Sequence, residues 1–199
     1  VLFFAIAGER ILRPVFPLRI AEVAIGPQVA EIAEPLSQPG IAGAVGLLVG
    51  LSALAGAMLA PIVVTLFLRR LGVARLMVGG FLVAALSAGG MLAASDLLGL
   101  ALANTAMAAA AALLQTAVYT WLGDRVDDRN RTAALSLSLF PLYAGAVVGP
   151  LITTLVSRLG MPRPGDELGL TPVFVGSTIL LALGIFAVRR LRAEGSPSR

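Results

Sequence analysis

The sequence predicts an all-α membrane protein with six transmembrane helices, on three observations. The 199 residues are 58% hydrophobic and 13% charged, whereas soluble domains carry about 25% charged residues. Six apolar runs approach or exceed the roughly 20 residues that a helix needs to cross a bilayer. The basic residues gather in alternate loops between these runs, as the positive-inside rule requires of short loops on one side of a membrane.

The apolar runs are predicted to be helices because only helices and closed barrels satisfy the backbone in lipid. The runs lack the alternation of period two that barrel strands show. We expect one bundle over residues 1–199, with a polar tail at 189–199. Its six spans are expected at Val1–Ile20, Ile41–Leu68, Leu76–Ala94, Leu97–Leu122, Thr132–Val156 and Thr171–Val188.

The residues at the ends of the apolar runs predict the connections between the spans, which we take in chain order. The chain begins VLFF, without Met and inside an apolar run, so we interpret the first span as truncated. The connection Glu22–Gly40 has three Pro and three Glu, which predicts a long external loop. Ser95–Asp96 predicts a tight turn between the third and fourth spans. Three Asp and three Arg in Gly123–Arg131 predict a solvated turn before the fifth span.

The Arg residues set the expected orientation of the bundle. All fifteen basic residues are Arg. The positive-inside rule places the side with ten of them in the cytoplasm, together with the C-terminus, and we expect a bacterial cytoplasmic membrane. These ten are Arg69, Arg70, Arg75, Arg125, Arg129, Arg131, Arg189, Arg190, Arg192 and Arg199.

Composition excludes several kinds of site. The chain has neither Cys nor His, so it lacks disulfides, thiolate nucleophiles and His general bases. We expect no metal, no cofactor and no enzymatic activity, because the sequence shows no acidic metal cluster and no phosphate-binding Gly loop. The basic residues form no continuous face, which argues against nucleic acid as a partner.

Four segments resemble motifs of the major facilitator superfamily, whose members have twelve spans built from two six-span halves. Thr65–Arg75 is similar to the family's G-x-x-x-D-R-x-G-R-R loop, and we assign Arg70, Gly72 and Arg75 to this loop motif. Arg70 and Gly72 match, but Thr65 replaces the first Gly, Arg69 the acid, and Val73 and Ala74 the paired basic residues. Asp127–Leu135 resembles the turn before a fifth span. The G-x-x-x-G-P element corresponds to Gly145, Gly149 and Pro150, and VFPL at 15–18 resembles a segment of drug-efflux members.

The resemblance implies the C-terminal half of a secondary transporter, with the N-terminal half of the same polypeptide missing. An N-terminal half remains the alternative. The implied function is proton-coupled efflux of small amphipathic molecules across the lipid bilayer by alternating access. Two other functions stay open: a transport-inactive scaffold or regulator with the same fold, and the permease subunit of an ATP-driven importer.

Charged residues within the first span are the main chemical candidates. Glu9, Arg10 and Arg13 fall in five positions, and a charge near the bilayer centre costs roughly 2.5–3.5 kcal/mol on insertion scales. Glu9 and Arg13 are four residues apart and share a helix face. We expect them to line a cavity, bind substrate or exchange protons. The alternative is an ion pair that locks this span to its neighbours.

Two further sets are candidates for binding and movement. Asn104, Gln115 and Tyr119 in the fourth span are expected to contact substrate, as the resemblance implies, or else to form interhelical hydrogen bonds. Gly145, Gly149 and Pro150 combine close helix packing with a missing backbone donor. They predict either a hinge for alternating access or a static interface.

Overall fold

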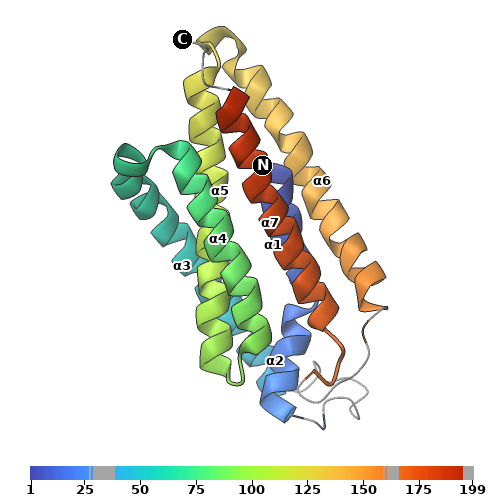
Figure 1. The fold of residues 1–199 in the computed structure, drawn as a ribbon. Coiled ribbons are helices and arrows are strands. Elements are labelled where there is room, and N and C mark those ends of the chain that lie inside the picture. Colours follow the sequence, from blue (N-terminus) through green and yellow to red (C-terminus); the bar gives the residue numbers. More distant parts are fainter. Residues whose placement is uncertain (27, 29–38, 159, 161–165, 195–199) are drawn as a thin grey trace.

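The computed structural model describes residues 1–26, 28, 39–158, 160 and 166–194 (Figure 1). Within these residues the chain is helical and has no β-strand, so the predicted all-α fold is confirmed. The helices are α1 (Leu2–Leu12), α2 (Phe16–Ile25), α3 (Pro39–Leu71), α4 (Val73–Ala93), α5 (Leu97–Arg125), α6 (Arg131–Ser157) and α7 (Thr171–Glu194), with a short 3-10 turn η3 (Asp128–Asn130).

Five helices in the described part of the chain, α3 to α7, are long and apolar enough to cross a membrane. The expected first span differs, because it is divided into α1 and α2 at Arg13–Val15. Pro14 and Pro17 explain the division, since neither has an N–H and each ring clashes with the carbonyl four residues earlier. Pro17 is tolerated in the first turn of α2, where no helical donor is needed.

Several boundaries also differ from the sequence prediction. Helix α2 continues to Ile25, so Glu22 lies inside a helix and not in the long connection. Helix α7 continues to Glu194 and takes in the first six residues of the expected tail. Most of the expected external loop, residues 27 and 29–38, lies outside the described residues. The tight turn is confirmed, because Asp96 caps α5 by accepting a 2.6 Å hydrogen bond from Gly99 N.

Helix packing repeats within the bundle. Helix α1 packs on α6 and α7, while α5 packs on α3 and α4, and α4 packs on α7. The same pairings result when α1 is exchanged with α5, α3 with α6, and α4 with α7. Helices α1 and α5 occupy equivalent central positions and touch each other. The bundle is therefore built from two similar groups of three helices that meet where α1 contacts α5 and α4 contacts α7.

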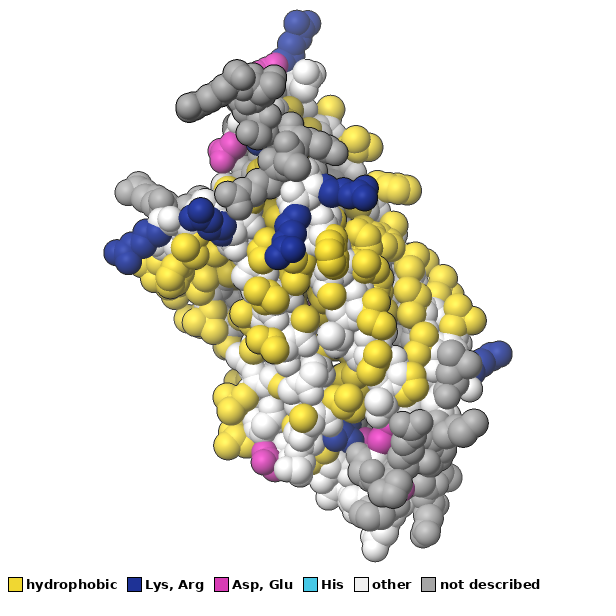
Figure 2. Space-filling model, viewed as in Figure 1, with side chains coloured by type: hydrophobic (Ala, Val, Ile, Leu, Met, Phe, Trp, Pro, Cys, Tyr) yellow, Lys and Arg dark blue, Asp and Glu magenta, His cyan; other side chains and the backbone are white. Residues whose placement is uncertain are grey.

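The charged residues divide between the two ends of the bundle. The α3–α4 turn, the α5–α6 turn and the C-terminal end of α7 lie toward the same end (Figure 1). Six Arg side chains are exposed there: Arg70, Arg75, Arg125, Arg129, Arg189 and Arg190. Apolar side chains cover the middle of the molecule in Figure 2. This separation agrees with the loop alternation expected from the sequence.

Substitution of Gly72 by Ala is expected to destabilise the α3–α4 turn. Gly72 separates the two helices with φ 74° and ψ 158°, a region that is almost closed to other residues and costs them about 1–3 kcal/mol. Thermal unfolding in detergent should show a lower midpoint for Gly72→Ala. Gly89→Ala is the control, because Gly89 lies inside α4, has no positive φ, and an added Cβ there meets no atom within 4 Å. Equal midpoints for the two variants would contradict the prediction.

Candidate functional site

The break between α1 and α2 exposes backbone carbonyls that other helices must satisfy. Val15 N donates to Leu12 O at 3.1 Å, three residues back, so it does not serve the Ile11 carbonyl. Thr153 of α6 takes its place, because its hydroxyl donates to Ile11 O at 2.7 Å. Ser177 of α7 adds a second contact, because its hydroxyl donates at 2.7 Å to Gly8 O, a carbonyl inside α1 that the break does not affect. Both hydroxyl residues are buried, and together they fix the broken helix to α6 and α7.

Glu9 forms an ion pair with Arg13 immediately before the break. Arg13 Nη2 lies 2.7 Å and Arg13 Nε 2.8 Å from Glu9 Oε1, as the spacing of four residues predicts. The Glu9 side chain is 17% exposed and that of Arg13 is 59% exposed. Arg13 can therefore leave the pair without crossing a packed region.

Arg10 is placed differently from its two neighbours in α1. Its Nε lies 4.0 Å from Glu9 Oε2, a weaker contact than the one with Arg13. The same Nε is buried and has no hydrogen-bond partner among the described residues. Arg10 thus supplies positive charge next to Glu9, and one of its donors is unused.

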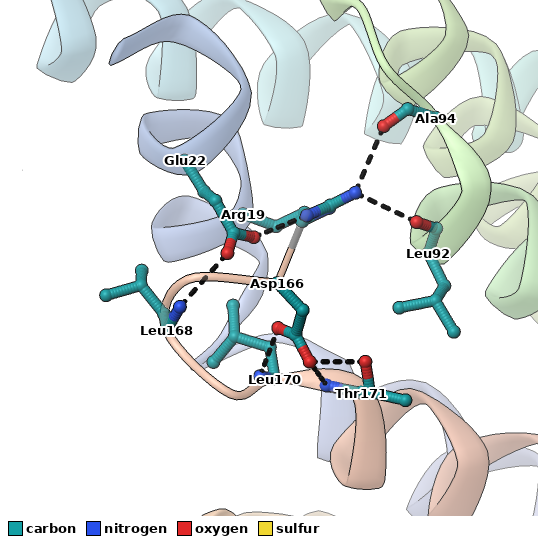
Figure 3. Close-up of polar contacts among 8 residues, drawn as sticks. All are labelled: Arg19, Glu22, Leu92, Ala94, Asp166, Leu168, Leu170 and Thr171. Atoms are coloured by element: carbon teal, nitrogen blue, oxygen red, sulfur yellow. Dashed lines mark hydrogen bonds and ion pairs between the residues drawn. The ribbon is translucent and has the colours of Figure 1, made fainter. Parts of the chain in front are cut away.

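A second ion pair, Arg19 with Glu22 in α2, is buried (Figure 3). The Arg19 and Glu22 residues are only 5% and 4% exposed. Arg19 Nη2 donates to the carbonyls of Leu92 at 2.8 Å and Ala94 at 3.1 Å, at the C-terminal end of α4 where helical carbonyls lack partners. Glu22 Oε1 accepts from Leu168 N at 3.0 Å. This pair joins α2, α4 and the segment before α7.

Asp166 completes the polar cluster at this end by capping α7 (Figure 3). Its Oδ1 accepts from Leu170 N at 2.6 Å, and its Oδ2 accepts from Thr171 N at 2.9 Å and from the Thr171 hydroxyl. A carboxylate at a helix N-terminus also interacts favourably with the helix dipole. Asp166 and Glu22 are therefore occupied by structural contacts, in contrast to Glu9.

Asn104, Gln115 and Tyr119 lie along one side of α5 and are half-buried. Their side chains form no hydrogen bond within the part of the chain that the structure describes. No hydrogen bond or ion pair between described residues joins them to the charged group on α1. Thr105 behaves otherwise, since its hydroxyl lies 3.2 Å from that of Ser52 in α3 and links the two helices.

Gly145 and Gly149 allow α6 to lie directly against α1. A Cβ at Gly145 would be 3.0 Å from Ala7 N, and one at Gly149 would be 2.7 Å from Arg10 Cβ. Both glycines are buried. Helix α6 continues past Pro141 and Pro150, although Pro150 has no N–H to donate to the Ala146 carbonyl. The close packing expected from the sequence is present, and α1 is its partner.

Comparison with known families identifies the family to which the chain belongs. The family model described as Major Facilitator Superfamily matches residues 1–199. The chain belongs to the major facilitator superfamily. No curated protein and no solved structure matches it. The resemblance seen in the sequence motifs is thus confirmed over the whole chain, and the protein is an integral membrane protein of a transporter family.

Sequence reasoning missed the polar residues that support the broken helix of this major facilitator protein. Thr153 and Ser177 lie in apolar helices as ordinary small polar residues, and nothing local indicates that each reaches a carbonyl of α1. The three-residue spacing of Arg19 and Glu22 is a usable signal for their pairing. Their burial follows from the extension of α2 and from contacts distant in sequence.

Replacing Thr153 by Val should destabilise this transporter fold, because Ile11 O would remain buried without a donor. An unsatisfied buried polar group costs roughly 1–3 kcal/mol. Thr154→Val is the matched control, since Thr154 is exposed and its hydroxyl donates only to Pro150 O in its own helix. Thermal unfolding in detergent should give a lower midpoint for Thr153→Val than for Thr154→Val. Identical midpoints would show that Thr153 does not support the break.

Proposed function

We propose that the chain is the C-terminal half of a proton-coupled efflux transporter for small amphipathic molecules. The family assignment supports secondary transport. The altered loop motif, with Thr65 and Arg69 in place of Gly and acid, supports the C-terminal half, where such copies are looser. The partner is then the N-terminal half of the same polypeptide, in a bacterial cytoplasmic membrane with the Arg-rich end cytoplasmic. The activity is transport and not enzymatic conversion.

Glu9 is the carboxylate that we assign to proton coupling, and the Glu9–Arg13 pair is the observation that carries this proposal. Glu22 is sealed by Arg19 and Leu168 N, while Asp96 and Asp166 cap helices. Glu9 alone among these four carboxylates has as its main partner a side chain that is more than half exposed. A proton can therefore take the place of Arg13 without loss of a helix cap.

The proposed cycle uses this exchange. Substrate binds beside Arg10 while deprotonated Glu9 holds Arg13. A proton bound to Glu9 removes the negative charge that holds Arg13, and the freed Arg13 then displaces the substrate. Asn104, Gln115 and Tyr119 supply hydrogen-bonding groups among the apolar side chains of α5, which suits an amphipathic molecule. Loss of the proton re-forms the pair and makes the site ready for the next substrate molecule, so proton and substrate occupy the site in turn.

Movement of α6 against α1 completes the proposal. Gly145 and Gly149 have no side chains, so the two helices pack closely there. Pro150, next to this contact, removes one backbone hydrogen bond of α6. In alternating access, one bundle rocks against the other around a site at mid-membrane. We assign Gly145, Gly149 and Pro150 to the hinge. Arg70, Gly72 and Arg75 form the cytoplasmic loop motif at the end of the same bundle.

Glu9→Gln is expected to abolish proton-driven transport. Gln keeps the size of Glu9, but its side-chain amide does not take up a proton near neutral pH. Transport by the complete protein in proteoliposomes should lose its response to an imposed pH gradient. Asp124→Asn is the control, since Asp124 is exposed in the last turn of α5 and should leave the response unchanged. Coupling that survives in Glu9→Gln would remove Glu9 from the mechanism. A folded wild-type protein without transport under any gradient would favour the scaffold or regulator.

Gly149→Leu is expected to lower transport while folded protein is still produced, because the added side chain separates α6 from Arg10 of α1. Gly176→Leu is the control, as a Cβ on Gly176 in α7 meets no atom within 4 Å. Transport rate should be measured together with the amount of monodisperse protein. Loss of the folded protein itself would identify the contact as static packing and would refute the hinge.

A further inference from the structure

An apolar groove runs between α3 and α4, with α5 as its floor. It has a volume of about 310 Å³ and is lined by residues that include Leu59, Val63 and Phe67 of α3, Gly79 and Val83 of α4, and Ala109 of α5. Helices α3 and α4 both pack closely on α5 but have little contact with each other. The groove is the space that this arrangement leaves open at the surface of the bundle.

Small residues keep the groove empty of side chains. Ala60, Gly79 and Ala109 all line it. A Cβ added at Gly79 would meet no atom within 4 Å, whereas one at neighbouring Gly80 would clash with Leu113 and Leu114 of α5. Gly79 is therefore not needed for helix packing, and its missing side chain leaves room for something outside the bundle.

The Arg-rich end of the groove meets a second hollow. Arg75 lines the apolar groove and also a hollow of about 220 Å³ between α4 and α7, which Arg189 lines as well. Both Arg side chains are exposed. Neither forms a hydrogen bond or an ion pair with any described residue. Two positively charged guanidinium groups are thus available where an apolar groove ends.

The sequence around Arg75 leaves this charge uncompensated. The segment from Phe67 to Arg75 contains three Arg and no acid. The hollow beside it adds Arg189, so a negative charge placed there meets two cations. Basic pockets between transmembrane helices on the cytoplasmic side are typical sites for anionic lipid head groups. The planar fork of Arg matches phosphate oxygens in pairs.

We propose that the groove between α3 and α4 and the hollow between α4 and α7 together bind one anionic phospholipid. Its phosphate lies between Arg75 and Arg189, and one acyl chain follows the groove between α3 and α4. The lining of α3 extends from Leu59 to Leu71, which is roughly 18 Å at 1.5 Å per residue and suits a long acyl chain. A zwitterionic lipid binds less well, because its own cationic group opposes the two Arg.

This site lies apart from the residues assigned to transport, except that Arg75 belongs to the loop motif. The lipid bridges α3 to α4 through its chain and α4 to α7 through its phosphate. It thereby fills the space that the small contact between α3 and α4 leaves open. The proposal does not depend on proton coupling or on efflux, so it can fail while the proposed function stands.

Native mass spectrometry of the complete polypeptide in mild detergent tests the site, with phosphatidylglycerol and phosphatidylcholine as probes. Phosphatidylglycerol should bind more tightly, and Arg75→Gln with Arg189→Gln should weaken it by roughly fivefold for each Arg removed. Arg129→Gln is the control for general surface charge, as Arg129 is exposed at the same end. Arg189→Gln alone serves if the double variant does not fold.

Gly79→Leu tests the groove separately, because Gly79 lines the groove and an added Cβ there meets no atom within 4 Å. It should weaken phosphatidylglycerol binding, whereas Gly89→Leu, also in open space on α4, should not. Equal binding of the two lipids, or unchanged binding in the Arg variants, would overturn the proposal. Unchanged binding in Gly79→Leu would overturn the acyl-chain assignment and leave only recognition of the head group.

Discussion

Pairing of backbone polar groups in lipid is the constraint on which this bundle depends. A broken helix at membrane depth is tolerated when neighbouring helices supply the missing partners. Here Pro14 divides the first span, and the Thr153 hydroxyl donates to the Ile11 carbonyl at the break. The Ser177 hydroxyl adds a bond to Gly8 O inside α1. The glycines of α6 bring its backbone close enough for the contact of Thr153. The close packing of α1 on α6 and the interruption of the helix between α1 and α2 therefore depend on each other.

The two ion pairs of the first span have opposite characters. Arg19 and Glu22 are buried, and their remaining atoms bond to the end of α4 and to the segment before α7. Removal of one partner from such a pair typically costs about 3–5 kcal/mol, so it behaves as a fixed joint. Glu9 and Arg13 are paired beside the break, and Arg13 is largely exposed. One end of the span is held, and the other retains an exchangeable charge.

Sequence patterns predicted the parts of this structure that are local. The apolar runs and the positions of the Arg residues predicted the transmembrane helices α3 to α7. The spacing of four residues predicted the ion pair between Glu9 and Arg13. Pro14 and Pro17 are present in the sequence, but transmembrane helices tolerate Pro, so these residues do not by themselves predict that the span is divided. Thr153, Ser177 and Glu22 could not be assigned, since each bonds to backbone atoms far away in the sequence. Gly149 was placed at a close contact, but its partner Arg10 required the fold.

The divided first span has a consequence for biosynthesis. Glu9 and Arg10 in α1, with Arg13 directly after it, make this segment a poor one for independent entry into the bilayer. The helices that satisfy its carbonyls, α6 and α7, begin at Arg131 and Thr171 and leave the ribosome much later. The first span must therefore wait, partly inserted or shielded, until these helices arrive. Its final position is fixed late in assembly, although it is the first span of this bundle to be made.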